Sequence, residues 1–279
     1  MRAIQVGVLF FCGVVSSTHA MTLHSKKAIV VGASTGIGRE VAKVLSHNGY
    51  ELGICSRKID LLNTLKQELS TPVHVRQLDL KDADNIHQTL QELVDEMGGM
   101  DLIVVNSGIW PESQQGILPK DKQIPFAWQR ETIAVNVTGC TAAFNFAINY
   151  FLKQNHGHVV GVSSTDAVRG HALNPSYCAS KSFMATFLEG WRNKFIQLGI
   201  PIDVTEIRPG WIQTTDDMLL DPDTANYAYW VSSSPAAAQG IYDAIVAKKK
   251  VAYVPWRWTI IGLLLNITPD WIYNKMGGF

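Results

Sequence analysis

The chain has 279 residues, of which 47% are hydrophobic and 17% charged, so it is long and apolar enough to bury one sizeable core. Lysine plus arginine and aspartate plus glutamate each total 24, which argues against nucleic acid or an anionic surface as the partner of the whole protein. Four scattered cysteines and the isolated pair His156 and His158 argue against a disulfide framework and a metal site. We expect a reduced, intracellular protein with a small, roughly neutral substrate.

The first twenty residues are of a different character. Arg2 precedes an uncharged stretch from Ala3 to Ala20, whose apolar centre is typical of a signal peptide and too short to span a bilayer. Met21 follows at once, so residues 1–20 are either an over-extended start or an export signal or anchor. We expect a cytoplasmic protein, with membrane association and export through residues 1–20 as the alternatives.

From Ala28 onwards, short β-branched runs alternate with longer amphipathic stretches, which is the pattern of repeated strand–helix–strand units. Several runs are apolar without alternation, as in a parallel sheet buried on both faces. The predicted strands are Ala28–Val31, Glu51–Cys55, Val73–Leu78, Asp101–Val105, His158–Ser163, Ile202–Ile207 and Val251–Val254. Residues 37–45 have the spacing of an amphipathic helix. The sequence predicts one α/β domain over residues 21–254, doubly wound around a mostly parallel seven-stranded sheet.

A glycine-rich loop follows the first predicted strand and leads into the first predicted helix. It comprises Gly32, Ser34, Thr35, Gly36, Ile37 and Gly38, together with Ala33. The missing side chains let the backbone turn tightly and approach a pyrophosphate, and free N–H groups at the helix start attract its negative charge. Because the loop lies between a strand and a helix, it predicts a Rossmann dinucleotide site rather than an ordinary turn.

The second predicted strand ends without the acidic residue that is typical of an NAD site. Ser56 and Arg57 stand there instead, followed by Lys58. Arg57 can form a charge-assisted contact with a 2′-phosphate, and Ser56 can add a hydroxyl donor. We therefore predict NADP(H) in preference to NAD(H). The alternative is that Arg57 and Lys58 lie in a solvated loop.

An acid–base pair is predicted in the second half of the chain. Tyr177 and Lys181 are four residues apart and so share one face of a helix. A free tyrosine has a pKa of about 10, and a nearby cation would lower it toward a useful range. Ser164 closes an apolar strand, where its hydroxyl would meet a ligand. Ser163 is the alternative, pointing to the opposite side of a regular strand.

Together these motifs resemble the short-chain dehydrogenase/reductase family, from about Lys27 to Val254. The motifs that occur in the family's order are the glycine loop, Asn106-Ser107-Gly108, Asn136, Ser164, Tyr177 to Lys181 and Pro209-Gly210. The resemblance implies that Tyr177 is the proton donor and that Lys181 binds the nicotinamide ribose and lowers the tyrosine pKa. It also implies that Ser164 orients the substrate and that Asn136 supports a water-mediated proton relay.

The same resemblance implies further cofactor contacts and an assembly. Asp79 and Leu80 would flank the adenine, and Asn106 would line the adenosine side. The carboxamide region would be reached by Pro209, Gly210, Ile212 and Thr214. One small departure is Val105-Asn106-Ser107-Gly108, where the family often has Asn-Asn-Ala-Gly. A homodimer or homotetramer is expected from the family.

The stretch from Trp211 to Ala238 is rich in apolar and aromatic residues. We predict that it is a mobile lid over an apolar or aromatic carbonyl or alcohol substrate, with Trp110 and His171 nearby. The alternative is that these side chains simply cover the sheet. The expected function is an NADP(H)-dependent oxidoreductase. A non-catalytic nicotinamide-binding sensor and a membrane-associated scaffold are the alternatives.

The last segment, residues 255–279, is a hydrophobic tail in which tryptophans, isoleucines and leucines crowd together after Lys248–Lys250. It is too short to span a bilayer. Apolar side chains bounded by tryptophan and basic residues indicate a peripheral membrane contact or a dimer contact. The alternative is a tail that packs over the substrate pocket.

Overall fold

The computed structural model describes residues 26–110, 125–170, 172, 174–214 and 229–275. The predicted leader at residues 1–20, His171 and residues 215–228 of the predicted lid lie outside the described residues. The described elements, in chain order, are β1 (Lys27–Val31), α1 (Gly36–His47), β2 (Glu51–Ser56), α2 (Ile59–Glu68), β3 (Val73–Gln77), α3 (Ala83–Met97), β4 (Leu102–Val105), α4 (Phe126–Thr132), the π-helix η2 (Ile133–Gly139), α5 (Cys140–Gln154), β5 (Gly157–Val162), the 3₁₀-helix η3 (Thr165–Ala167), α6 (Pro175–Leu198), β6 (Ile202–Pro209), β7 (Ile212–Gln213), β8 (Ser232–Ser233), α8 (Ser234–Val246), β9 (Val251–Val254), α9 (Trp258–Ile267) and α10 (Asp270–Tyr273).

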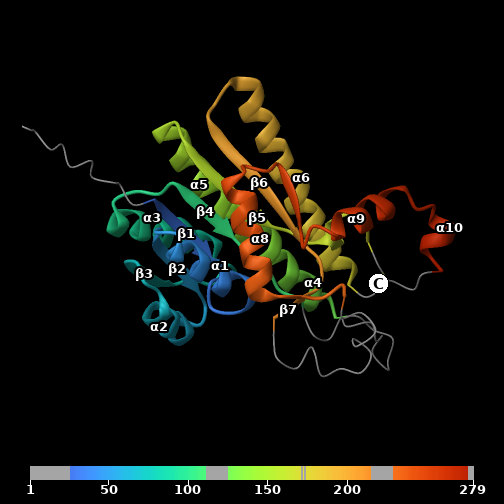
Figure 1. The fold of residues 1–279 in the computed structure, drawn as a ribbon, viewed down its shortest axis with the longest axis horizontal. Coiled ribbons are helices and arrows are strands. Elements are labelled where there is room, and N and C mark those ends of the chain that lie inside the picture. Colours follow the sequence, from blue (N-terminus) through green and yellow to red (C-terminus); the bar gives the residue numbers. More distant parts are fainter. Residues whose placement is uncertain (1–25, 111–124, 171, 173, 215–228, 276–279) are drawn as a thin grey trace, which may run out of the picture.

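The main sheet has seven strands in the order β3-β2-β1-β4-β5-β6-β9, and every neighbouring pair is parallel (Figure 1). Val30 of β1 is in register with Ile54 of β2 on one side and with Val104 of β4 on the other. The strand order reverses between these neighbours, which is the point where a doubly wound sheet binds its ligand. The predicted fold class is confirmed. The predicted strand Val251–Val254 matches β9, and the other predicted strand boundaries differ from the observed ones by at most two residues.

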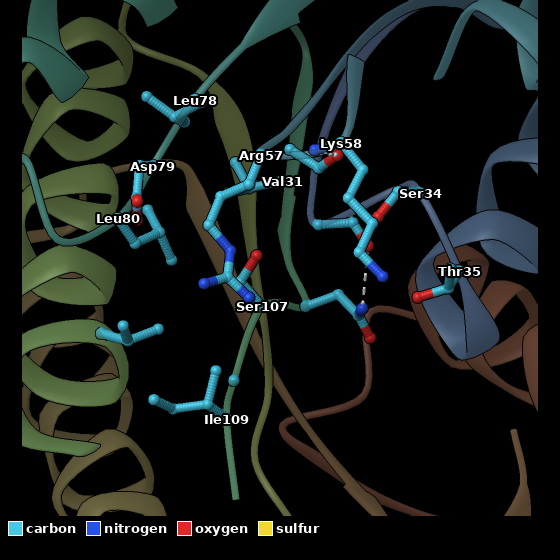
Figure 2. A pocket seen from close by; sticks show the side chains of 15 residues that line it. Val31, Ser34, Thr35, Arg57, Lys58, Leu78, Asp79, Leu80, Ser107 and Ile109 are labelled. Carbon is cyan, nitrogen blue, oxygen red and sulfur yellow. Dashed lines mark hydrogen bonds between the residues drawn. The ribbon is translucent and has the colours of Figure 1, made fainter. Parts of the chain in front are cut away.

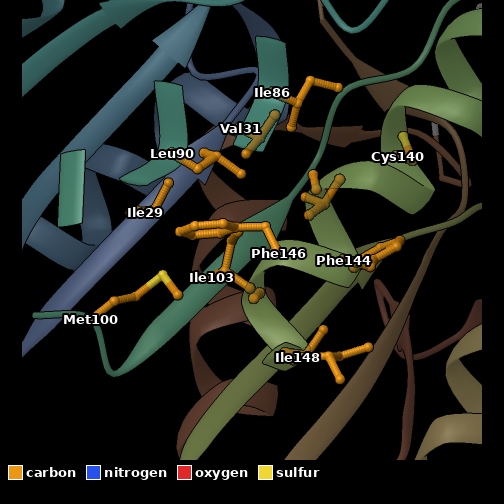
Figure 3. Packing of buried hydrophobic residues seen from close by; sticks show 14 of the residues in the cluster. Ile29, Val31, Ile86, Leu90, Met100, Ile103, Cys140, Phe144, Phe146 and Ile148 are labelled. Atoms are coloured by element: carbon orange, nitrogen blue, oxygen red, sulfur yellow. The ribbon is translucent and has the colours of Figure 1, made fainter. Parts of the chain in front are cut away.

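Helices cover both faces of the sheet, which explains why its strands are apolar without alternation. Ile29 packs into a core cluster with residues of α3, α5 and α6, as Figure 3 shows for part of that cluster. Its neighbours Ala28 and Val30 point to the opposite face, where α1, α2 and α8 form a second cluster. Since successive side chains of a strand alternate between faces, both positions must be apolar when both faces are buried.

A buried histidine links two central strands. His158 of β5 is 8% exposed, and its Nε2 lies 2.8 Å from the Thr205 hydroxyl of β6. Burial lowers the pKa of His158 to about 4, because the charged imidazolium loses its hydration inside the sheet. This histidine therefore has a structural partner within the sheet.

The chain continues beyond the sheet into α9 and α10, which lie at the margin of the molecule in Figure 1. Trp258 at the start of α9 is 4% exposed, so this end of the helix packs firmly on the domain. Within the described part of the chain, every helix is too short or too polar to cross a membrane. A short parallel pair, β7 and β8, joins the two ends of the predicted lid region.

Candidate active site

The glycine loop is a backbone cradle at the carboxyl end of β1. Gly32 has a φ of +86°, in the left-handed region that side chains disfavour. A Cβ on Gly38 would lie 2.1 Å from the Gly32 carbonyl oxygen and 2.6 Å from the Asn106 side-chain nitrogen. Asn106 also donates to that carbonyl at 3.2 Å. Glycine at these positions therefore lets α1 begin directly against β1 and β4.

The N-terminus of α1 faces the first of two cavities. Its cap residue, Thr35, makes no side-chain capping hydrogen bond, so the first N–H groups of the helix remain available to a ligand. The cavity has a volume of about 200 Å³. Eight of the residues predicted from the sequence line it, namely Gly32, Ser34, Thr35, Ser56, Arg57, Asp79, Leu80 and Asn106. The structure thus brings together the loop after β1, the end of β2 and the end of β3.

Two positive side chains line this cavity at the end of β2. Figure 2 shows the Arg57 side chain extending into the cavity, between Leu80 on one side and Thr35 on the other. Lys58 lines the same cavity and is exposed like Arg57. The Ser56 hydroxyl accepts a hydrogen bond from the Lys58 N–H at 3.2 Å, which fixes the turn that carries both cations. The arrangement suits a dianionic group at this end of the ligand.

A second cavity of about 510 Å³ continues from the first, since Thr35, Asn106, Gly108 and Ile109 line both. The remaining predicted residues that line it are Gly36, Ile37, Ser164, Tyr177, Lys181, Pro209, Gly210, Ile212 and Thr214. The Thr214 side chain packs over Gly36, where a Cβ would lie 3.3 Å from the threonine methyl. Two linked cavities of these sizes, with an anion-binding cradle between them, fit an extended dinucleotide with its substrate.

Ser164 and Tyr177 meet in the second cavity. Ser164 follows β5 and its hydroxyl accepts a hydrogen bond from the Asp166 N–H at 3.1 Å. Burial raises the pKa of Tyr177, the nearby Asp166 carboxylate raises it further, and a hydrogen bond with Ser164 opposes the rise. The phenol is therefore protonated at neutral pH and can donate a proton.

Lys181 is 3% exposed and lies one helical turn after the tyrosine. Its Nζ donates to the Val162 carbonyl oxygen at 2.9 Å and lies 5.5 Å from the centroid of the Tyr177 ring. Burial lowers the pKa of Lys181 itself. Burial is the largest cause of the raised pKa of Tyr177 in this structure, and the lowering of that pKa by Lys181 stays a prediction.

The side chain of Asn136 is buried and makes hydrogen bonds to two other segments of the protein. It lies in η2 and is 1% exposed. Its Oδ1 accepts from the Ile109 N–H at 2.8 Å, and its Nδ2 donates to the Ile109 carbonyl at 2.9 Å and to the Ser180 hydroxyl at 3.0 Å. Ser180 in turn donates to the Tyr177 carbonyl oxygen at 2.7 Å. The π-helical turn directs Asn136 away from its own helix, into the loop after β4.

The alternative serine has a different role. The Ser163 hydroxyl lies 2.7 Å from a carboxylate oxygen of Glu206 and 3.0 Å from the Ile207 carbonyl oxygen. Glu206 is 1% exposed and forms an ion pair with Arg208 on the same strand. Ser163 therefore ties β5 to β6 while Ser164 faces Tyr177.

Residues 26–224 match the family model described as short chain dehydrogenase. The chain belongs to the short-chain dehydrogenase family. An uncharacterized oxidoreductase of Myxococcus xanthus is 34% identical over 193 residues, which cover 68% of this chain and 73% of the relative. An uncharacterized oxidoreductase of Mycobacterium tuberculosis is 29% identical over 252 residues, which cover 88% and 94% of the two chains.

The fold is shared with solved structures of low sequence identity. A structure of a variant of actinorhodin polyketide ketoreductase with NADPH superposes with a TM-score of 0.71 at 22% identity, covering 82% of this chain and 94% of the other. The family predicted from the motifs is confirmed, and the protein is an oxidoreductase of this family.

Apart from the family motifs, tryptophan side chains lie beside Tyr177 in the second cavity. The Trp110 ring is stacked on the Tyr177 ring, with centroids 6.1 Å apart and an interplanar angle of 28°. Trp211 lines the same cavity and contacts Trp258 of α9. Trp110 and Trp211, which we predicted near the substrate, both line the second cavity. Ser180 was not predicted, since nothing in its local sequence distinguishes it from a packing residue. Trp258 belongs to the hydrophobic tail, for which packing over the substrate pocket was one of the predicted alternatives.

Proposed function

We propose that this protein is an NADP(H)-dependent carbonyl reductase that acts on an apolar or aromatic substrate. The observation that carries the proposal is the convergence of Ser164, Tyr177 and Lys181 on a cavity that continues the dinucleotide cradle. Trp110 and Trp211 supply apolar walls to that cavity, which supports a substrate with a ring or an alkyl chain.

The proposed reaction adds one hydride and one proton to a carbonyl group. The reduced nicotinamide, when bound, supplies the hydride to the carbonyl carbon. Tyr177 donates its phenolic proton to the carbonyl oxygen, while the Ser164 hydroxyl hydrogen-bonds to the same oxygen and holds it in place. The raised pKa of Tyr177 supports this direction, because the residue is protonated before the reaction. The Lys181 ammonium, 5.5 Å from the centroid of the Tyr177 ring, offsets the charge of the phenolate that remains.

The proposed preference for NADP(H) rests on charge at the adenosine end. Arg57 and Lys58 extend into the cavity at the end of β2, where an NAD site usually has a carboxylate. Asp79 lies at the end of β3 instead, and its Oδ1 accepts from the Lys81 N–H at 3.0 Å. That bond fixes the carboxylate in its own turn, which leaves the two cations to meet a 2′-phosphate.

The reaction can be tested by following NADPH oxidation against a panel of apolar ketones. The Tyr177→Phe variant keeps the ring and its stacking but removes the proton donor, so we expect a decrease in kcat of about 100-fold or more. The matched control is Tyr242→Phe. Tyr242 lies on α8 and packs against the core cluster formed with α1 and α2, so this variant should keep the wild-type rate. Equal rates for the wild type and Tyr177→Phe would exclude Tyr177 as the acid.

We also propose that the outer face of α9 contacts the headgroup region of a membrane. Ile260, Leu263, Leu264 and Ile267 follow helical spacing on this face and are 51% to 75% exposed. Trp256 and Trp271, at the two ends, are 74% and 67% exposed. Aromatic residues flanking an aliphatic face are typical of a helix that lies in a bilayer interface.

The charges around this face favour an anionic bilayer over a second protein copy. Lys275 is exposed beyond the C-terminal end of the face, Arg257 at its start donates to the Val231 carbonyl oxygen at 3.2 Å, and the nearby Asp270 is paired with Arg169. Co-sedimentation with vesicles of phosphatidylcholine and phosphatidylglycerol would measure the contact. We expect the double variant Leu263→Gln/Leu264→Gln to lose binding, whereas the equally exposed Leu198→Gln on α6 keeps it. A change in the oligomeric state without any vesicle binding would contradict the proposal.

A homodimer or homotetramer stays a prediction, and light scattering coupled to size-exclusion chromatography measures it. The cytoplasmic location likewise stays a prediction, for which fractionation of full-length protein is the measurement.

A further inference from the structure

The loop that follows Ser164 is bonded to the far C-terminal end of the chain. Arg169 donates hydrogen bonds to the carbonyl oxygens of Leu265 at 3.4 Å and Thr268 at 2.5 Å, at the C-terminal end of α9. Its guanidinium also pairs with Asp270 and lies 4.0 Å from the centroid of the Tyr273 ring. The Arg169 guanidinium thus donates to helix-end carbonyl oxygens, forms an ion pair with a carboxylate and makes a cation–π contact with a tyrosine ring.

A second bond closes the same junction from the other side. The Tyr273 hydroxyl donates to the Gly170 carbonyl oxygen at 3.0 Å. The loop is also anchored on its own domain, because the Ser182 hydroxyl of α6 donates to the Ala167 carbonyl oxygen at 2.8 Å. The loop between Ser164 and Gly170 therefore connects helix α6 with the C-terminal segment, which we define as residues 255–275.

The C-terminal segment also reaches the wall of the site at its other end. The Trp258 indole lies against Gly210, where a Cβ would come within 2.3 Å of the ring. Its Nε1 donates to the Trp230 carbonyl oxygen at 3.0 Å, and its centroid is 5.5 Å from that of Trp211. The segment is therefore fixed at both ends, by Trp258 near the cofactor loop and by Arg169 near the catalytic serine.

A small cavity of about 30 Å³ lies between the segment and the site. Thr165, Asp166 and Trp211 line both this cavity and the 510 Å³ cavity, so the small one adjoins the substrate side of the large one. Its remaining walls come from Arg169 and from the C-terminal segment, namely Trp258, Ile261, Leu265 and Tyr273. Apolar side chains of the segment thus lie beside one end of the 510 Å³ cavity, across the small cavity.

We propose that Arg169 is a positioning residue that holds the C-terminal segment as the end wall of the substrate cavity and so limits the length of the substrate. The inference rests on the proposed carbonyl reductase function. It assigns to this chain a specificity element outside the part that matches the family model, which ends at residue 224. Arg169 acts through the segment and takes no part in proton transfer.

The Arg169→Gln variant in the full chain tests the proposal, with Arg76→Gln as the matched control. Arg76 is also bonded to two carboxylates and a carbonyl oxygen, but it lies on β3. Hydrogen exchange of the amides in α9 is the first measurement, and it needs no turnover. We expect exchange at least 10-fold faster in Arg169→Gln and unchanged in Arg76→Gln. Unchanged protection of α9 in Arg169→Gln would overturn the proposal.

Specificity is the second measurement, using methyl ketones of increasing alkyl length. Binding is read from quenching of tryptophan fluorescence, and reduction from NADPH oxidation. We expect Arg169→Gln to shift the tightest-binding length toward longer ketones, with affinity for the longest ones raised at least 5-fold and NADPH affinity unchanged. A parallel loss of affinity at every length would show a merely structural role and overturn the proposal. Ketone binding without any reduction by the wild type would contradict the reductase function and leave the shift in length measurable.

Discussion

The two cavities of the site are built from different parts of the sequence. The first cavity, which we propose holds the adenosine end of the cofactor and call the adenosine cavity, is formed by Val135 of η2 and by residues at the ends of β1, β2, β3 and β4. The second cavity, which we propose holds the substrate and call the substrate cavity, adjoins segments far apart in the chain, where Arg169 contacts Asp270 and Trp211 contacts Trp258. The first cavity is therefore fixed by the sheet, and the second depends on how loops and the C-terminal segment pack on it.

This difference predicts how each region responds to substitution. A side chain added in the glycine cradle meets backbone that cannot move without shifting a strand. Side chains around the substrate cavity meet other side chains, which can repack at a smaller cost. Changes at the adenosine end should therefore abolish cofactor binding, and changes at the substrate end should alter selectivity.

The largest effect is expected from Gly38→Ala. The new Cβ would lie 2.1 Å from the Gly32 carbonyl oxygen, so α1 must move away from β1 and carry its N-terminus out of the cradle. We expect NADPH affinity to fall by about 1000-fold, or about 4 kcal/mol, in a calorimetric titration. Gly190→Ala, on α6 with open space around it, is the control and should bind normally. Wild-type affinity for NADPH in Gly38→Ala would contradict the proposed difference between the two cavities.

Acid should lower the free energy of unfolding of the whole domain and so affect both cavities alike, because His158 lies in the sheet that carries them. Its pKa of about 4 in the folded protein is below the ordinary value of 6.5, so the unfolded chain binds the extra proton first. The contribution to stability is complete above about pH 6.5 and is lost as the pH falls toward 4, by up to about 3 kcal/mol. Urea unfolding at several pH values measures it. His158→Gln should flatten this dependence, whereas the exposed His156→Gln should keep it.

A smaller effect, confined to the adenosine cavity, is expected from Arg57→Gln. Loss of the charge should lower kcat/KM for NADPH by about 100-fold, or about 3 kcal/mol, as for a charged hydrogen bond to phosphate. Values for NADH should change by less than about 2-fold, because NADH has no phosphate at this position. Steady-state kinetics with both cofactors decide. A parallel decrease with NADPH and NADH would mean that Arg57 supports the fold rather than selecting the cofactor.

The smallest effect is expected from Trp110→Ala, in the substrate cavity. Loss of the ring stacked on Tyr177 should raise KM for an aromatic ketone by about 10-fold, or about 1.4 kcal/mol, with NADPH affinity unchanged. Trp110→Phe should retain most of the affinity, and Trp271→Ala on the exposed face of the C-terminal segment should have no effect. A decrease in NADPH affinity together with the rise in KM would show that a residue of the substrate cavity also affects cofactor binding, which would contradict the comparison.

Local patterns allowed much of the fold and of the adenosine cavity to be predicted. The glycine loop, Arg57 and the pair Tyr177 and Lys181 are short motifs beside a strand or within one helix, so their spacing alone places them. The choice between Ser163 and Ser164 stayed open because one residue changes the face of a strand. The structure bonds Ser163 to Glu206 on the neighbouring strand and Ser164 to Tyr177, a difference that the spacing alone does not show.

Long-range contacts and burial could not be predicted in this way. Arg169 and Asp270 are 101 residues apart, and no local pattern connects them. The two bonds of Asn136 to Ile109 likewise join segments 27 residues apart. The burial of the Tyr177 phenol, which raises its pKa, could not be predicted for a related reason. Sequence spacing identifies the nearby lysine, but only the folded protein shows how much water the phenol loses.

The contact between Gly210 and Trp258 makes these two positions interdependent. A side chain at residue 210 would require a smaller residue at 258, because the indole already occupies the space of a Cβ. Gly210 lies within the part of the chain that matches the family model, and Trp258 lies beyond it. Among relatives that have such a C-terminal segment, the two positions should therefore vary together, with a bulkier residue at one accompanied by a smaller residue at the other.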